Sequence, residues 1–482
     1  MLKFLRQVFS ESAVYGVAAV LGQIAPFLLV PIFTRNLGQD GVGIVSLVNS
    51  IIAFLSILAA LALDNSAHRF FWDSEDARDR AVTFGTWFWM FLGTSVILGV
   101  LTVLLAAPVS VLAHVPLARE SLVLGGLSLP FRVSQNVLIN WFRVKRLPVY
   151  AVVFGLGGTL VLLACSVLLV AVYDRGVSGV FEAQLASGIL VTVAGLPLMR
   201  VWGSPKLISL ARLQAMLKYA APLIPAGLAA WALNLSDRWI LQFSLSSAEV
   251  GLYQVASTVA MGVGLPVLAF QQAWGPFALS IVNRPGVQRV YAVVMVSFAL
   301  LSCVAACLIS VFSSEITVWL ASRGFVSAAS SVVFLALAQV LTGLGVVAAI
   351  GLNIAKQNAP IAVALFVAAG IKIALTFLLL PLLGRDGAAM ATVVSQFVMT
   401  VIVFYAAQKV YPIPYLFLEV CWLLLFTGVF CFFARGIPGA AERLVLLVAF
   451  LLVACTAVFW RVRRFAMIAL VSEVDSSPAR RI

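Results

Sequence analysis

Apolar runs long enough to cross a lipid bilayer recur along the whole of this chain. A transmembrane helix needs about 20 consecutive, mainly apolar residues. Fourteen runs of this kind lie at 12–34, 41–63, 81–106, 117–141, 149–173, 177–199, 216–243, 249–272, 290–312, 325–353, 360–383, 387–409, 415–435 and 440–460. With 63% hydrophobic and 10% charged residues, the chain has too few polar side chains to cover a soluble core. The sequence therefore predicts an all-α polytopic membrane protein of about fourteen transmembrane helices.

The loops between these runs carry lysine and arginine in an alternating pattern. If the N-terminus is cytoplasmic, 21 of the 31 Lys and Arg residues lie on the cytoplasmic side, 7 lie on the other side, and 3 lie within runs. A threefold excess of this kind follows the positive-inside rule, so both termini are predicted to be cytoplasmic. The same loops account for the net charge of +13, because short basic loops orient helices and meet anionic lipid. Nucleic acid is therefore not an expected partner.

The chain also contains an internal duplication. The segment Val42-Gly43-Ile44 is matched by Val250-Gly251-Leu252, roughly 210 residues later in the chain. The stretch at 143–148 ends in a proline that opens a new apolar run, and so does the stretch at 355–360. Duplicated multi-helix units are typical of secondary transporters, which bind substrate between the repeats. The duplication thus indicates a carrier.

Six helices per repeat is an even number, so both repeats begin on the same side of the membrane and are predicted to be parallel. This gives a first six-helix lobe at 1–199, a cytoplasmic linker at 200–215 and a second six-helix lobe at 216–409. Residues 410–482 hold two further helices without counterparts in the repeat and a cytoplasmic tail.

The run at 117–141 contains polar residues at three- and four-residue steps, which places them along one helical face. They are Ser121, Gly125, Ser128, Arg132, Gln135, Asn136, Asn140 and Arg143. A charge at the centre of a bilayer costs roughly 2.5–3.5 kcal/mol on insertion scales, so it needs water, a partner or a ligand. We expect this face to line an aqueous path.

Other runs contain isolated polar residues, for which more than one interpretation is open. Lys372 lies near the centre of its run, and Asp237 and Arg238 lie in the outer part of theirs. Arg238 either lines the path or reaches the outer interface, because long cationic side chains can extend to water. Lys372 and Arg132 either line the path or form buried ion pairs, with Glu182 or Asp237 as partners. A further expectation is that Asp237 pairs with Arg35.

The sequence offers little support for enzymatic chemistry. It contains no phosphate-binding G-x-x-x-x-G-K-[ST] loop, no H-E-x-x-H and no G-x-S-x-G, which are the common signatures of nucleotide, zinc and serine chemistry. The six cysteines lie within apolar runs without a CxxC motif, and there are two histidines. We therefore predict no metal site, no cofactor and no enzymatic activity.

Three segments of the chain resemble a known family. The stretch at 222–256 resembles the second-lobe start of bacterial polysaccharide flippases, in which an Asp-Arg pair precedes a short loop and a Val-Gly-x-Tyr motif. It contains Asp237, Arg238, Val250, Gly251 and Tyr253. The matching stretch at 31–47 contains Thr34, Arg35, Leu37 and Gly43, and the segment 387–392 adds a third similar motif. The chain thus resembles the Wzx-like branch of the multidrug/oligosaccharidyl-lipid/polysaccharide exporter superfamily.

This resemblance implies a flippase in the bacterial inner membrane. Its substrate would be undecaprenyl-diphosphate-linked oligosaccharide for surface polysaccharide such as lipopolysaccharide or exopolysaccharide, and membrane lipids and polysaccharide polymerase or assembly proteins would be its partners. An anionic, hydroxyl-rich headgroup calls for a path lined by cations and amides. Candidate cavity residues are Arg132, Gln135, Asn136, Asn140, Lys372, Arg238, Asp237, Arg35 and Asn49. Alternatives are a cation-coupled drug or metabolite antiporter, a flippase for the peptidoglycan precursor lipid II, and a scaffold without transport activity.

Overall fold

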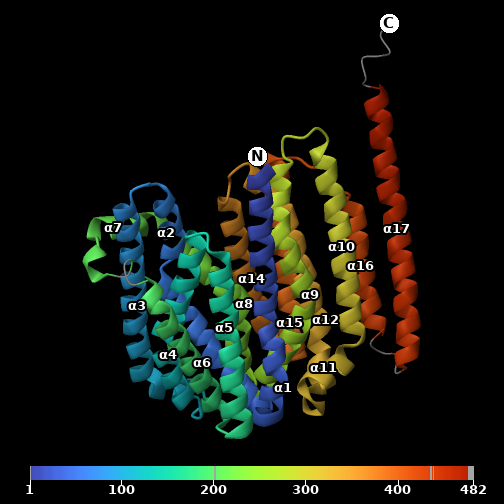
Figure 1. Ribbon diagram of the computed structural model, residues 1–482. Helices are drawn as coiled ribbons and strands as arrows, with labels where there is room; N and C mark the ends of the chain where they lie inside the picture. Colours follow the sequence, from blue (N-terminus) through green and yellow to red (C-terminus); the bar gives the residue numbers. More distant parts are fainter. Residues whose placement is uncertain (1, 200–201, 203, 435–436, 438, 476–482) are drawn as a thin grey trace. The chain divides into compact units, whose positions relative to one another are not determined.

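The structure is a computed structural model that describes residues 2–199, 202, 204–434, 437 and 439–475. The described elements are helices, without strands among them (Figure 1). The α-helices are α1 (Leu2–Ala60), α2 (Leu63–Trp72), α3 (Ala77–Leu112), α4 (Ala118–Val144), α5 (Pro148–Ser166), α6 (Gly176–Gly195), α7 (Leu210–Ala220), α8 (Leu223–Ser244), α9 (Ser247–Ser280), α10 (Val287–Val311), α11 (Ser313–Ala321), α12 (Ala329–Ala348), α13 (Ile350–Ile354), α14 (Ala359–Leu383), α15 (Arg385–Val410), α16 (Phe417–Ala434) and α17 (Ala440–Asp475). Four short helical segments are η1 (Val167–Val172), η2 (Leu196–Met199), η3 (Pro205–Leu207) and η4 (Arg323–Ala328).

The helices confirm the predicted fold class. Among the described residues, 12 helices are long and apolar enough to cross a membrane, or 13 if α7 and α8, which meet at a bend of 52°, form one span. The first predicted run and most of the second fall within α1, where Gly38 interrupts the helix with φ 66° and ψ −172°. Glycine tolerates this conformation because it has no Cβ.

The ends of several helices follow from local sequence. The Asp76 carboxylate accepts hydrogen bonds from the backbone N–H groups of Arg78 and Asp79, so α3 begins at that point. Pro148 occupies the first turn of α5, where its missing N–H costs nothing. Leu61 and Ala62 have positive φ values of 46° and 51°. They end α1 and turn the chain into α2.

The described chain forms two compact units. The first comprises Met1–Thr258, Thr317–Ser331 and Leu365–Ser395, and the second comprises Val259–Ile316, Val332–Ala364 and Gln396–Ile482. These units do not coincide with the predicted lobes, because parts of α9, α12, α14 and α15 pack with the N-terminal helices. The division into two six-helix lobes stays a prediction.

Within the first unit, α1 and α9 touch through their backbones at two glycines from the duplicated motif. A Cβ on Gly43 would lie 1.9 Å from the carbonyl oxygen of Ser247, and a Cβ on Gly251 would lie 2.0 Å from that of Gln39. Small residues permit such close approach of membrane helices. The two copies of the motif thus form one contact, in which neither glycine can carry a side chain without displacing a helix.

The core of the first unit is aromatic and lies mainly between α3 and α4. Phe84, Trp87 and Phe88 of α3 are buried together with Trp141 and Phe142 of α4. Within the second unit, α10 packs against α16 and α17, and these three helices lie side by side in Figure 1. The contact between α10 and α16 includes Cys307 and Cys431, whose sulfur atoms are 3.6 Å apart as free thiols.

Candidate functional site

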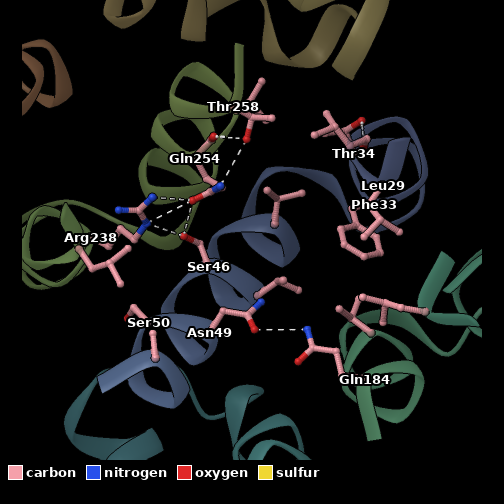
Figure 2. Close-up of a pocket in the computed structure, with 18 residues that line it drawn as sticks. Leu29, Phe33, Thr34, Ser46, Asn49, Ser50, Gln184, Arg238, Gln254 and Thr258 are labelled. Carbon is pink, nitrogen blue, oxygen red and sulfur yellow. Dashed lines mark hydrogen bonds between the residues drawn. The ribbon is translucent and has the colours of Figure 1, made fainter. Parts of the chain in front are cut away.

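The first unit contains a cavity of about 380 Å³ between α1, α5, α6, α8 and α9, called here the α1–α8 cavity (Figure 2). This volume lies within the usual range for small-ligand sites. The polar residues that line it are Thr34, Ser46, Asn49, Ser50, Gln184, Arg238, Gln254 and Thr258. Opposite Arg238, Leu29 and Phe33 form an apolar wall. The mixture of an apolar wall and convergent polar groups is typical of a binding site.

Among the described residues that line the cavity, Arg238 is the one that carries a charge. Its Nε donates to Ser46 Oγ at 3.0 Å, and its Nη2 donates to Gln254 Oε1 at 2.9 Å. Its Nη1 donates to the carbonyl oxygen of Asn234 and to the Asp237 carboxylate. These bonds fix the planar guanidinium, and one N–H of Nη2 remains without an acceptor among the described residues. A fixed guanidinium with a free donor is suited to an anionic oxygen.

A second polar pair lies on the other side of the cavity. Gln184 Nε2 of α6 donates to Asn49 Oδ1 of α1 at 3.2 Å (Figure 2). The Gln184 Oε1 atom is buried and has no hydrogen-bond partner among the described residues. An unpaired buried acceptor costs about 1–3 kcal/mol. A ligand with hydroxyl donors would satisfy it.

Two tryptophans attach α8 to α1 beside the cavity. Trp239 Nε1 donates to Ser50 Oγ at 2.8 Å, and Trp231 Nε1 donates to the Ser50 carbonyl oxygen at 2.9 Å. Arg238 precedes Trp239 by one position on α8, so these contacts set the side of α8 from which the guanidinium enters the cavity.

Behind Arg238 lies a buried ion pair. The Asp237 carboxylate accepts from Lys372 Nζ at 2.8 Å and from Tyr253 Oη at 2.7 Å. Lys372 Nζ also donates to the Leu233 carbonyl oxygen at 2.6 Å, and Thr392 Oγ1 lies 3.3 Å from Tyr253 Oη. Lys372 and Asp237 are 1% and 2% exposed. One carboxylate thus serves two cations, which leaves a net charge of +1 beside the cavity.

Comparison with known proteins identifies the family. The sequence profile described as "Polysaccharide biosynthesis protein" matches residues 8–281, more than half of the chain. The chain belongs to the polysaccharide biosynthesis protein family. A protein of the Lsg locus of Haemophilus influenzae is 23% identical over 330 residues, which are 66% of this chain and 78% of that protein.

Solved structures confirm the fold of this polysaccharide biosynthesis protein. Lipid II flippase MurJ in an inward closed conformation is similar with a TM-score of 0.72 and 11% identity, over 94% of this chain and 99% of MurJ. A multidrug resistance MATE family transporter of the MOP superfamily gives a TM-score of 0.67 and 13% identity, over 83% and 95%. The protein therefore has the fold of these multi-pass membrane transporters, and the resemblance to Wzx-like flippases is confirmed.

The candidate residues named from the sequence lie in different places. Arg238 and Asn49 line the α1–α8 cavity, whereas Asp237 and Lys372 are buried behind it. Arg35 is exposed on α1. The remaining four lie on α4 and are not among the cavity's lining residues: Arg132, Gln135, Asn136 and Asn140.

The structure contradicts one expected contact of these residues and decides between the alternatives for two others. Asp237 pairs with Lys372 and not with Arg35, because α14 brings an ammonium group directly to the carboxylate. Arg238 does not extend to the interface, since it is 8% exposed and held by four polar neighbours. Of the alternatives for Lys372, the buried ion pair with Asp237 is the one present.

Glu182 pairs with neither Lys372 nor Arg132, the two partners considered from the sequence. Arg175, immediately before α6, contacts it at 2.6 Å. The hydrogen bond to Glu182 and the charge of that carboxylate raise the pKa of Arg175.

Sequence reasoning did not select two amides of the cavity. Gln184 and Gln254 each bring a side-chain amide into an otherwise apolar run, and Gln254 directly follows Tyr253, the last residue of the Val-Gly-x-Tyr motif. A single amide is a weak signal, because many such residues only bond their own helix. The contacts of Gln254 with Arg238 and Ser46 depend on three helices and cannot be read from one.

Proposed function

We propose that this protein is a flippase that moves undecaprenyl-diphosphate-linked oligosaccharide across the bacterial inner membrane, with both of its termini in the cytoplasm, for surface polysaccharide synthesis. The observation that carries the proposal is the position of Arg238. It is the one charged side chain that the described part of the chain places on the wall of the α1–α8 cavity, and it belongs to a cluster with a net charge of +1. Membership of the polysaccharide biosynthesis protein family supports the choice of substrate.

The chemistry of the cavity suits the headgroup. A diphosphate offers anionic oxygens to the free N–H of Arg238, and sugar hydroxyls can donate to the unpaired Gln184 Oε1. Asn49 Nδ2 and Gln254 Nε2 add amide donors. The volume of about 380 Å³ holds part of a headgroup. The lipid chain can stay in the bilayer while the protein alternates between its two sides, as transporters built from repeats do.

A drug or metabolite antiporter fits the cavity less well. A site for cations would need a carboxylate on the wall, yet the cavity's lining residues include no Asp or Glu. Asp237, which is adjacent in sequence, is already paired with Lys372 and with Arg238. The balance of charge therefore favours an anionic substrate.

The test is complementation of a deletion strain by Arg238→Gln, with surface polysaccharide, lipid-linked precursor and protein abundance measured together. We expect loss of polysaccharide, accumulation of precursor in the cytoplasmic leaflet, and near-normal abundance, since Asp237 keeps Lys372. Arg119→Gln, which removes an exposed arginine at the start of α4, is the matched control and should complement fully.

Three outcomes would contradict the proposal. Normal export by Arg238→Gln would show that the substrate does not depend on the α1–α8 cavity. Accumulation of lipid II in the deletion strain would favour a peptidoglycan-precursor flippase. Increased drug sensitivity with normal polysaccharide would favour an antiporter.

A further inference from the structure

One face of α4 changes character halfway along the helix. Its first half is buried: Ser121, Gly125 and Ser128 are covered, and a Cβ on Gly125 would lie 3.0 Å from Ile52 of α1. The second half of the same face is open, with Arg132 and Asn136 among its exposed residues. Steps of three and four residues keep all these positions on one side of the helix. The face that is packed under α1 therefore becomes a free polar surface.

The length of α1 explains the change. Beyond Ile52 it continues for eight residues to Ala60, a rise of about 12 Å, whereas α4 continues from Gly125 to Arg143 for about 27 Å. After α1 ends, Leu61 and Ala62 turn the chain, and α2 packs against α3 and α7. The second half of the α4 face thus extends beyond the end of α1, with α5 at its edge beside Gly155 and Gly158.

Arg132 is the decisive residue on this open face. It lies next to the midpoint of α4, its side chain is exposed, and it has no hydrogen bond or ion pair with any described residue. A central cation without a partner needs water or an anion. The exposed Leu127 is five residues away, about 140° around the helix, so it marks a different, apolar face of α4. We therefore expect Arg132 to face water and not lipid.

The residues beyond Arg132 form an ordered polar row. Asn140 Nδ2 donates to Asn136 Oδ1 at 2.5 Å, and Arg143 Nη1 donates to Asn140 Oδ1 at 3.4 Å. Gln135 lies at the edge of the row, next to Gly158 of α5. The two arginines are 11 residues apart, about 16 Å along the axis. Such a row matches an extended ligand that has both anionic oxygens and hydroxyls.

We propose that Arg132, Gln135, Asn136, Asn140 and Arg143 form a second binding site, the α4 trough, for a sugar diphosphate. This proposal rests on the proposed function, because it takes the ligand to be the headgroup of the lipid-linked oligosaccharide. The trough is separate from the α1–α8 cavity, since no α4 residue lines that cavity. The substrate would bind at two stations, one with Arg132 and one with Arg238.

The test measures access and protection at Ile139, a partly buried residue that lies between Arg132 and Arg143 on the same face of α4. Ile139→Cys is made in the full chain after replacement of the six native cysteines, purified into nanodiscs and labelled with a hydrophilic maleimide. Leu127→Cys, on the apolar face, is the control. We expect Ile139→Cys to react at least about tenfold faster, because thiolate chemistry requires water. Equal rates would overturn the aqueous trough.

Protection then identifies the ligand. Farnesyl-diphosphate-disaccharide at about ten times its Kd should slow the labelling of Ile139→Cys about tenfold, because only the unoccupied protein reacts. Farnesyl monophosphate should not protect. Addition of Arg132→Gln should abolish protection, whereas addition of Arg238→Gln should leave it. Equal protection by a nucleotide diphosphate sugar such as UDP-glucose would overturn the lipid-linked source.

The two proposals can fail separately. If export by cells depends on Arg238 but Arg132→Gln retains protection, the trough is wrong and the flippase proposal stands. If no probe protects Ile139→Cys in a variant that still exports polysaccharide, the trough is also wrong. If the deletion strain keeps normal export, the flippase proposal itself is wrong.

Discussion

Two intramembrane cations that look equivalent in the sequence have opposite surroundings in the structure. Lys372 and Arg132 each lie next to the midpoint of an apolar helix, α14 and α4. Lys372 is 1% exposed and bonded to Asp237 and the Leu233 carbonyl oxygen. Arg132 is exposed and has no such partner among the described residues. The first charge has been neutralised by the fold, whereas the second is available to a ligand.

The difference shows that a charge within a membrane helix is not by itself a substrate contact. Breaking a buried pair leaves a charge without compensation and destabilises the protein, whereas removal of an exposed cation costs little stability. Stability and transport should therefore separate the two residues. Four variants test this comparison, from the largest expected effect to the smallest.

Asp237→Asn should have the largest effect. It leaves Lys372 and Arg238 close together without a carboxylate, so we expect a loss of about 3–5 kcal/mol and a steep fall in protein abundance. Abundance by immunoblot and the melting temperature of the purified protein are the measurements. A stable but inactive protein would contradict the structural role and make Asp237 a candidate site for a coupling ion.

Lys372→Met should be less severe, because Arg238 and Tyr253 still contact Asp237. Adding Lys372→Met to Asp237→Asn should recover part of the abundance that Asp237→Asn alone loses. The methionine removes one of the two cations that the missing carboxylate leaves uncompensated. Additive losses in the double variant would show that the pair does not act as a unit. Normal abundance with no export for Lys372→Met would move Lys372 to the substrate path.

Arg132→Gln should change transport and not stability. We expect a melting temperature close to that of the wild type and export per molecule reduced about tenfold, as for one lost charge-assisted contact. Arg132→Lys should retain part of the activity, because it keeps the positive charge. It should not retain all of it, because lysine lacks the planar, two-pronged donor geometry of arginine. A fall in abundance as large as that of Lys372→Met would erase the distinction between the two residues.

Glu182→Gln should have the smallest effect. Its partner in the structure is Arg175, immediately before α6, in a pair that is exposed at the arginine and partly exposed at the carboxylate, and solvent-accessible pairs contribute little. Export and melting temperature should match those of the wild type. A loss of export similar to that of Arg132→Gln would indicate that Glu182 pairs with Arg132 during the transport cycle.

The fold class followed from the sequence because backbone polar groups in lipid must bond internally, so long apolar runs become helices. Most runs coincide with helices for the same reason, although the described residues form 12 or 13 candidate spans and not fourteen. The run at 216–243 was predicted as one helix, but the structure divides it between α7 and α8, which meet at a bend. The duplicated motifs identified Gly43 and Gly251, but the sequence could not show that these two glycines touch each other.

The sequence by itself determined which polar residues lie in the membrane; only the tertiary structure decided what each one does. Periodicity placed Arg132 and Asn136 on one face of a helix, because that depends on the helical repeat alone. The interaction partner of each residue cannot be predicted in this way, because it depends on which helices pack together. Lys372 lies 135 positions from Asp237 in the chain, and no local pattern connects them. The open end of the α4 face likewise exists because α1 stops short of it, and that is a property of packing between helices.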